Sequence, residues 1–243
     1  MKHLKSALQF LTILPLGGSE PFDSRNIVPY FPLVGLVVGL LLAVFDKIAA
    51  MFWIRPVAAA VDVILLAAVT GAFHLDGLAD AADGMFGHRS RERALEIMKD
   101  SRVGAMGLVT IVGCLMLKWA GLMAVGAHHR FLMLLLIPAY ARSGMMFGIR
   151  ALPYGRPGGG TAFAFFENPL KPEDFKWLLA PVAGSFFLGW RGIWLNLVFA
   201  LTLAAILGFY RKRMGCITGD MLGAMTELME TVLFLMMSAG GMS

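Results

Sequence analysis

The stretch Phe31-Pro-Leu-Val-Gly-Leu-Val-Val-Gly-Leu-Leu-Leu-Ala-Val-Phe-Asp-Lys-Ile-Ala-Ala50 decides the class of fold. It carries no charged residue before Asp46. Its length is close to the roughly 20 residues that an α-helix needs to cross the hydrocarbon core of a bilayer. A run this long and this apolar predicts a membrane-spanning helix rather than a buried helix of a soluble protein.

Comparable apolar runs recur along the chain. The further candidate spans are 57–73, 103–125, 131–149, 177–190, 193–210 and 217–239. Together the runs predict an all-α, polytopic integral membrane helical bundle of about seven transmembrane helices, which forms a single domain over residues 1–243. The N-terminal run Met1–Leu16 has Lys2 and Lys5 in front and Pro15 near its end, which predicts an amphipathic helix at the membrane interface.

The overall composition supports this class. Of the 243 residues, 58% are hydrophobic and 15% are charged, whereas soluble domains average about 45–50% and about 25%. This excludes a disordered chain and an ordinary cytosolic enzyme. The net charge of +5 is typical of cytoplasmic loops beside an anionic lipid surface, so we expect no nucleic-acid partner. The two cysteines, Cys114 and Cys216, lie in apolar stretches, which excludes a disulfide scaffold or a cysteine-based zinc site.

The distribution of Lys and Arg predicts the orientation. If the N-terminus is cytoplasmic, most of the 21 basic residues fall in cytoplasmic segments, including both long loops, 73–102 and 150–176. Few basic residues fall on the opposite side, and these are Lys47, Arg55, Arg130 and Arg191. This asymmetry is what the positive-inside rule describes.

Three aspartates follow one another in the stretch His74-Leu-Asp76-Gly-Leu-Ala-Asp80-Ala-Ala-Asp83-Gly84. Their spacing of i, i+4 and i+7 places them on one face of a helix. Like charges along one face repel each other, so the arrangement costs stability unless a cation lies there. Carboxylate oxygens are ligands that Mg²⁺ prefers, and the small residues between them leave room for a ligand or a neighbouring helix. The alternative is a solvated loop with unrelated carboxylates.

A second acidic group lies at the start of the last span, in Thr218-Gly-Asp220-Met-Leu-Gly-Ala-Met-Thr-Glu227-Leu-Met-Glu230. Its three carboxylates also lie close to one helical face. Charges inside an apolar span usually face a cavity, a metal or a partner. A structural ion pair, for example between Glu230 and Arg142, is the alternative. On the predicted topology Asp220 emerges at the same membrane surface as the three aspartates.

Basic residues between these groups are candidates for binding phosphate. Lys99 and Arg102 lie just before the span at 103–125, where helix N–H groups would assist them, although anchoring at the headgroups is an alternative. Arg156 lies in the glycine-rich loop 154–161, which is a weak phosphate signal and equally a flexible connector. The role of His74 has three alternatives, which are a general base, a ligand and a packed imidazole. Acidic faces for a metal and cations for phosphate, at one membrane surface, predict phosphoryl-group transfer.

Several stretches resemble the cobalamin synthase family, the adenosylcobinamide-GDP ribazoletransferases. They are Leu11–Pro15, Phe31–Gly35, Phe73–Gly84, Ile97–Gly104 and Thr218–Ala224, followed by Glu227. The similarity covers nearly the whole chain, in order, and the HLDGLAD and MKDSR stretches are specific.

The resemblance implies a multi-pass enzyme of the bacterial inner membrane, with Mg²⁺ as cofactor and an active site facing the cytoplasm. It would transfer the adenosylcobinamide-phosphate group from adenosylcobinamide-GDP to α-ribazole, or to α-ribazole 5′-phosphate, and release GMP. The implied partners are these substrates and the lipid bilayer, and homo-oligomerisation is left open.

The sequence therefore predicts a set of site residues. The expected metal ligands are Asp76, Asp80, Asp83 and Asp220. The expected catalytic residues are His74, Asp83 and Glu227. The expected substrate-binding residues are Lys99, Arg102, Arg156 and Thr218.

Two alternative functions follow from parts of the pattern. Asp80-Ala-Ala-Asp83-Gly84 matches the first half of the CDP-alcohol phosphotransferase motif, but the second half is missing from the chain. A transporter would use the intramembrane Glu227 and Glu230 as proton or cation sites, but it leaves the three aspartates without a purpose.

Overall fold

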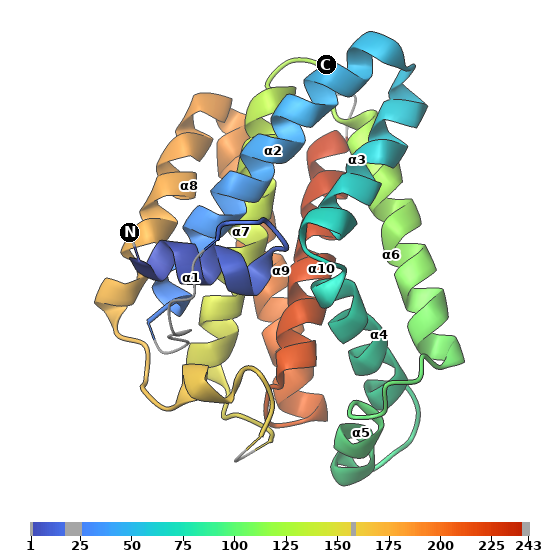
Figure 1. The fold of residues 1–243 in the computed structure, drawn as a ribbon, viewed down its shortest axis with the longest axis vertical. Coiled ribbons are helices and arrows are strands. Elements are labelled where there is room, and N and C mark those ends of the chain that lie inside the picture. The colour runs from blue at the N-terminus through green and yellow to red at the C-terminus, as the bar shows by residue number, and fades with distance from the viewer. Residues whose placement is uncertain (1, 18–25, 157–158, 240–243) are drawn as a thin grey trace.

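The computed structural model describes residues 2–17, 26–156 and 159–239, which form α-helices, 3₁₀ turns and short loops (Figure 1). The α-helices are α1 (Lys2–Leu11), α2 (Phe31–Phe52), α3 (Arg55–Val69), α4 (Phe73–Met85), α5 (Arg91–Ile97), α6 (Ala105–Ala124), α7 (Arg130–Ala151), α8 (Leu179–Ser185), α9 (Trp190–Arg213) and α10 (Gly219–Ser238). The 3₁₀ turns are η1 (Val28–Tyr30), η2 (Phe163–Phe166), η3 (Pro172–Leu178) and η4 (Phe186–Leu188). The predicted all-α class is confirmed.

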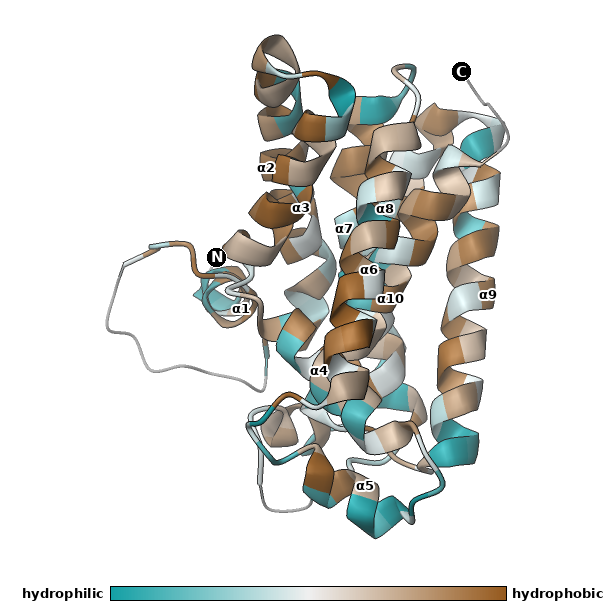
Figure 2. Ribbon diagram, turned by 90° about the vertical axis from the view of Figure 1, so that its right-hand side faces the viewer, coloured by the Kyte–Doolittle hydropathy of each residue, from teal (hydrophilic) through white to brown (hydrophobic). Residues whose placement is uncertain are grey.

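Five of the helices, α2, α6, α7, α9 and α10, are long and apolar enough to cross a membrane. Each has at least 20 residues, which at 1.5 Å per residue matches the bilayer core of about 30 Å. Figure 2 shows apolar residues along the shafts of these helices and polar residues toward the ends of the molecule. The chain is therefore a multi-pass membrane protein.

The predicted count of seven spans is not confirmed. The run at 57–73 forms α3, which is too short to cross alone, and α4 follows after a bend of 88°. Gly71 and Ala72 form this bend with φ angles of +60° and +56°, a left-handed conformation that ends a helix. The two helices count as a sixth, broken span only if they are taken together.

The run at 177–190 is not a single helix either. It is divided among η3, α8 and η4, and α9 begins at Trp190. Pro181 cannot donate a helical backbone hydrogen bond, and Gly189, with a φ of +60°, separates η4 from α9. The short elements nevertheless pack beside α7 and α9, so they complete one side of the bundle (Figure 1).

The N-terminal run forms α1, which ends at Leu11 and lies across the bundle instead of along it (Figure 1). Its buried residues are Ser6, Ala7 and Leu11, so one side of this helix faces the protein. The Phe10 ring packs edge-on against the rings of Phe73 and Phe165. The predicted amphipathic helix is confirmed, and its position at the membrane interface stays a prediction.

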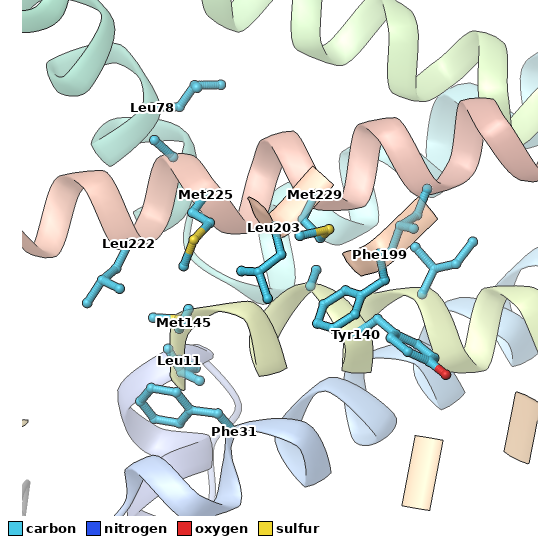
Figure 3. Packing of buried hydrophobic residues seen from close by; sticks show 14 of the residues in the cluster. Leu11, Phe31, Leu78, Tyr140, Met145, Phe199, Leu203, Leu222, Met225 and Met229 are labelled. Atoms are coloured by element: carbon cyan, nitrogen blue, oxygen red, sulfur yellow. The ribbon is translucent and has the colours of Figure 1, made fainter. Parts of the chain in front are cut away.

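The core is built around α7 and α10. Figure 3 shows Met225 of α10 pointing toward Met145 of α7, and Phe199 of α9 packs against Tyr140 with ring centroids 5.1 Å apart.

On the other side of α7, α2 approaches so closely that the backbones touch. A Cβ atom added to Gly35 or Gly39 would collide with the α7 backbone at Ala139 or Leu135. Small residues at such contacts are typical of helix pairs in membranes.

The bundle has two distinct ends (Figure 1). At one end lie α4, α5 and the loop between α7 and η3; we call this the aspartate end, because it carries Asp76, Asp80, Asp83 and Asp220. At the opposite end, the far end, lie the α2–α3 and α6–α7 turns. Which end faces the cytoplasm stays a prediction.

Candidate active site

The two acidic segments meet because glycines let α4 and α10 approach each other closely. A Cβ atom added to Gly77 would lie 2.8 Å from the carbonyl oxygen of Asp220. One added to Gly223 would lie 3.2 Å from the Cα atom of His74. Of the small residues of α4 expected to leave room for a helix neighbour, Gly77 therefore does so, and its neighbour is α10.

The aspartate helix forms as the spacing predicted. Asp76 is exposed in the first turn of α4, where a negative charge is favourable beside the positive end of the helix dipole. Asp80 and Asp83 follow one and two turns later and are half-buried. All three face the aspartate end of the bundle.

Asp83 has a defined structural partner. Its Oδ2 accepts a hydrogen bond of 2.7 Å from the Gly104 N–H, and its Oδ1 accepts one of 2.9 Å from the Gly107 N–H. These N–H groups begin α6 and have no partner inside that helix. Asp83 thus caps α6 from another helix, in addition to its predicted metal and catalytic roles, which stay predictions.

We expect Asp83→Asn to lower the free energy of unfolding by about 1–3 kcal/mol, because the amide NH₂ group cannot accept the second backbone hydrogen bond. Unfolding in detergent micelles, followed by loss of helical circular dichroism, measures the change. The matched control is Asp76→Asn, which removes an exposed carboxylate from the same helix. Equal stability of the two variants would contradict the capping role.

Asp220 lies in the first turn of α10, which Thr218 caps. The Thr218 hydroxyl accepts a hydrogen bond of 3.3 Å from the Met221 N–H, and the side chain is buried. The same hydroxyl lies 3.4 Å from the Asp220 carboxylate. Thr218 was expected to bind substrate; the structure gives it the position of an N-cap, which is typical for threonine.

Arg156 reaches this site through a short backbone pairing between distant loops. The Gly155 N–H donates to the Ile217 carbonyl at 2.8 Å, and the Ile217 N–H donates to the Pro153 carbonyl at 3.0 Å. This pairing holds the loop against the start of α10, where the Arg156 guanidinium lies 2.6 Å from the Asp220 carboxylate. The predicted convergence of Arg156 with the acidic residues is therefore seen.

The carboxylates influence one another electrostatically. Asp80 lies on α4, outside the five long apolar helices, and burial together with the carboxylates of Asp220 and Asp76 raises its pKa to about 7. Arg156 opposes this rise. Burial contributes most to this rise, and the neighbouring carboxylates add to it because like charges disfavour the ionised form. The contact of Gly77 with the Asp220 backbone places the two acidic segments side by side. The two acidic groups thus share one site.

The donor set suits a hard divalent cation. Among the described residues, no three His, Cys, Asp or Glu side chains are gathered tightly enough to enclose a metal ion. Mg²⁺ does not need such a cage, because it usually binds through one or two carboxylates together with water and substrate phosphates. The oxygens of Asp76, Asp80 and Asp220, which carry mutually repelling charges, fit this pattern. The expected Mg²⁺ itself stays a prediction.

Lys99 and Arg102 lie at the aspartate end but on the surface. Lys99 follows α5 and is exposed. The Arg102 guanidinium binds the Asp100 carboxylate through two nitrogens, the shorter contact being 2.6 Å, and its side chain is 87% exposed. This pairing lowers the pKa of Asp100 to about 2. Both cations remain accessible to a phosphate from solvent.

His74 points away from the aspartates into the bundle. Its side chain is fully buried, and neither ring nitrogen has a hydrogen-bond partner within the described part of the chain. The charged groups that influence it are Arg142, Glu230 and Lys118. Of the three alternatives for His74, the packed imidazole matches this position best.

Glu227 and Glu230 belong to a buried charge cluster between α6, α7 and α10. Lys118 of α6 lies 2.5 Å from a Glu227 oxygen and 2.9 Å from a Glu230 oxygen. Arg142 of α7 lies 2.7 Å from the other Glu230 oxygen. The structural ion pair considered for Glu230 and Arg142 is therefore present. Glu227, expected to be catalytic, pairs with Lys118, and its catalytic role stays a prediction.

Two arginines that are not among the expected site residues bind the end of α4. Arg89 donates to the Asp83 carbonyl at 2.6 Å, and Arg213 donates to the Met85 carbonyl at 3.1 Å. Basic side chains near helix C-termini commonly bind the last carbonyls in this way. Nothing in the spacing of these residues distinguishes them from membrane-anchoring cations, so only the tertiary structure identifies them.

Comparisons with known proteins give consistent results. The family model described as "Cobalamin-5-phosphate synthase" matches residues 3–238. The chain is similar to the adenosylcobinamide-GDP ribazoletransferase of Roseiflexus sp. (strain RS-1), being 38% identical over 233 residues, 93% of this chain and 85% of that protein. It is likewise 38% identical to the protein of that name from Geotalea daltonii over 239 residues, 97% of this chain and 96% of that protein. No solved structure matches the chain.

Proposed function

Because the chain belongs to the cobalamin-5-phosphate synthase family, we propose that it transfers the adenosylcobinamide-phosphate group from adenosylcobinamide-GDP to α-ribazole or α-ribazole 5′-phosphate. GMP is the other product. Membership of the family makes the chain a transferase acting on phosphate groups. The resemblance found in the sequence is thereby confirmed, and neither the CDP-alcohol phosphotransferase nor the transporter alternative is favoured.

The observation that carries the proposal is the meeting of carboxylates from α4 and α10 beside Arg156. Asp80 is influenced by Asp76 and Asp220, and the Arg156 guanidinium contacts Asp220. A pyrophosphate substrate needs a cation-binding carboxylate set and a guanidinium in one place. This combination supports phosphoryl transfer at the aspartate end.

In the proposed site, Asp76, Asp80 and Asp220 hold Mg²⁺, with Asp83 contributing whatever lone pairs the α6 amides leave free. When bound, the ion neutralises the pyrophosphate and the charge that leaves with GMP. Arg156 exchanges its contact with Asp220 for the phosphate oxygens of the substrate. Lys99 and Arg102, which are accessible at the same end, bind the phosphate of the substrate that lies nearer to the protein surface.

The proposed reaction is a single displacement at phosphorus. A ribose hydroxyl oxygen of α-ribazole forms a bond to the phosphorus attached to the cobinamide arm, and the bond from that phosphorus to the oxygen of GMP breaks. The hydroxyl proton passes to a carboxylate of the aspartate helix. We assign this step to a carboxylate rather than to His74, because the His74 ring is sealed inside the bundle.

We propose that the aspartate end faces the cytoplasm of a bacterial cell from the inner membrane. The segments at this end hold most of the 21 Lys and Arg residues, as the positive-inside rule requires of the cytoplasmic side. The nucleotide-activated substrate and GMP would then be exchanged with the cytoplasm.

The reaction is tested with the full chain reconstituted in lipid vesicles. We expect GMP and a new corrinoid to form from adenosylcobinamide-GDP and α-ribazole in equal amounts, and only when Mg²⁺ is present. Chromatography with mass detection measures both products, and comparison of α-ribazole with its 5′-phosphate identifies the preferred acceptor. Undiminished product formation in excess EDTA would contradict the metal requirement.

A further inference from the structure

The far end of the bundle contains a hollow that the proposed reaction does not use. Its volume is about 500 Å³, and it lies between the end of α2, the start of α3 and the start of α7. Charged side chains line it, among them Asp46, Lys47, Arg55 and Arg130. The hollow is thus separated from the aspartates by the length of the bundle (Figure 1).

The floor of the hollow is a fixed, buried ion pair. Arg130 donates to the two oxygens of Asp46 at 2.9 and 2.7 Å, and it also donates to the carbonyls of Leu122 and Val125. Its side chain is 6% exposed. Arg55 lies 2.7 Å from the same carboxylate. One carboxylate therefore binds two guanidinium groups at once.

The remaining charges leave the hollow positive. Asp62, fully buried, is the second acidic residue here and lies 3.7 Å from Arg130. Lys47 adds a third cation, which is exposed and lies 4.9 Å from the centre of the Phe131 ring. Among the described residues it has no carboxylate within ion-pair distance. Three cations thus face two carboxylates, and Lys47 is left to bind an external anion.

This concentration of cations is unexpected for its position. Lys47, Arg55 and Arg130 are three of the few basic residues outside the predicted cytoplasmic segments. The positive-inside rule disfavours Lys and Arg on that side. Asp46 accounts for Arg55 and Arg130, so Lys47 is the cation here whose charge is left for a negatively charged group from outside the chain.

The surroundings indicate which group this is. The α2–α3 turn beside the hollow exposes Met51, Phe52, Trp53 and Ile54, and Met51 is 79% exposed. Apolar and aromatic side chains in such turns lie at the level of lipid headgroups. The anion available at this level is the phosphate of a phospholipid, and a lysine near the end of a membrane helix extends to the level of these phosphates.

We propose that this hollow binds the headgroup phosphate of an anionic phospholipid, with Lys47 contacting the phosphate and the acyl chains lying along the apolar outer faces of α2 and α3. The Arg130–Asp46–Arg55 cluster, which forms the floor of the hollow, joins α2, α3 and α7 there. An anionic lipid is favoured over a zwitterionic one because the acidic residue among the described residues that line the hollow is Asp46, whose carboxylate is already bound by Arg55 and Arg130 and is not available to a choline group. The inference does not depend on the proposed reaction.

The test uses the full chain, delipidated in a neutral detergent, and native mass spectrometry with thermal unfolding. The probes are short-chain phosphatidylglycerol, short-chain phosphatidylcholine and inorganic phosphate. We expect phosphatidylglycerol to bind most tightly and to raise the unfolding temperature. Lys47→Gln should weaken this binding about fivefold, the effect of about 1 kcal/mol for one lysine near a lipid phosphate. Lys47→Arg should retain it.

The matched control is Lys212→Gln, which removes an exposed lysine from the other end of the bundle and should leave phosphatidylglycerol binding unchanged. Equal binding to wild type and Lys47→Gln would overturn the proposal. So would an equal loss in the Lys212 variant, or equal binding of phosphatidylcholine. If inorganic phosphate stabilises the protein as much as phosphatidylglycerol does, the hollow is a free-phosphate site and the lipid assignment is wrong.

Discussion

Asp80→Asn is expected to lower turnover by about 100- to 1000-fold, the loss typical when a group that stabilises developing charge is removed. The same substitution should leave the protein as stable as the wild type, or more stable, in metal-free buffer. Asp80 is half-buried and is influenced by Asp76 and Asp220. Replacing its carboxylate with a neutral amide of the same shape removes this like-charge repulsion from the folded state.

The opposite directions of the two effects make the test specific. A residue needed only for folding would lose stability and activity together, whereas a binding group held against repulsion loses activity alone. Turnover is measured as GMP release by protein reconstituted in vesicles, and stability as the unfolding midpoint in detergent. Glu173→Gln, at a carboxylate that is 75% exposed, is the control and should change neither. Normal turnover by Asp80→Asn would refute its role in metal binding.

The local features of the fold and the site could be predicted from the sequence. The apolar runs at 31–50 and 131–149 predicted α2 and α7 to within two residues of their observed bounds. The i, i+4, i+7 spacing predicted the helical face of Asp76, Asp80 and Asp83. These predictions succeed because helical periodicity and hydrophobic length are properties of neighbouring residues.

The features that depend on distant contacts could not be predicted. Asp83 binds backbone N–H groups more than 20 residues away, and backbone groups leave no signature in the sequence. Arg156 reaches Asp220 through the pairing of Gly155 with Ile217, which no local pattern encodes. Pro181 is a signal in the sequence against a continuous helix at 177–190, because proline lacks the backbone N–H of a helical residue.

Lys118 is a signal in the sequence for the buried charge cluster. A lysine inside an apolar run is costly and usually has an acidic partner. Glu227 is a carboxylate of the last apolar run that has no assigned cation partner, so its pairing with Lys118 was within reach of the sequence. Instead, the helical face that Glu227 shares with Asp220 favoured a catalytic role for Glu227.

Lys118→Met is expected to lower the free energy of unfolding by about 3–5 kcal/mol, the cost typical of removing one partner of a buried ion pair. The Lys118 side chain is 2% exposed and contacts both Glu227 and Glu230. Arg142 continues to pair with Glu230 in the variant, so the charge left without a partner is that of Glu227. Denaturation of the detergent-solubilised protein with increasing SDS measures the change.

The double variant Lys118→Met/Glu227→Gln tests the cause. It removes one charge of each sign, so the cluster stays neutral and we expect most of the lost stability to return. If the double variant loses as much stability as Lys118→Met and Glu227→Gln lose together, the two charges act independently and the pairing is contradicted. Because the double variant folds, its GMP release also decides the predicted catalytic role of Glu227. If the cluster only fixes α10, and with it Asp220, against α6 and α7, the double variant turns over near the wild-type rate. If Glu227 is the proton acceptor, the double variant is folded but inactive.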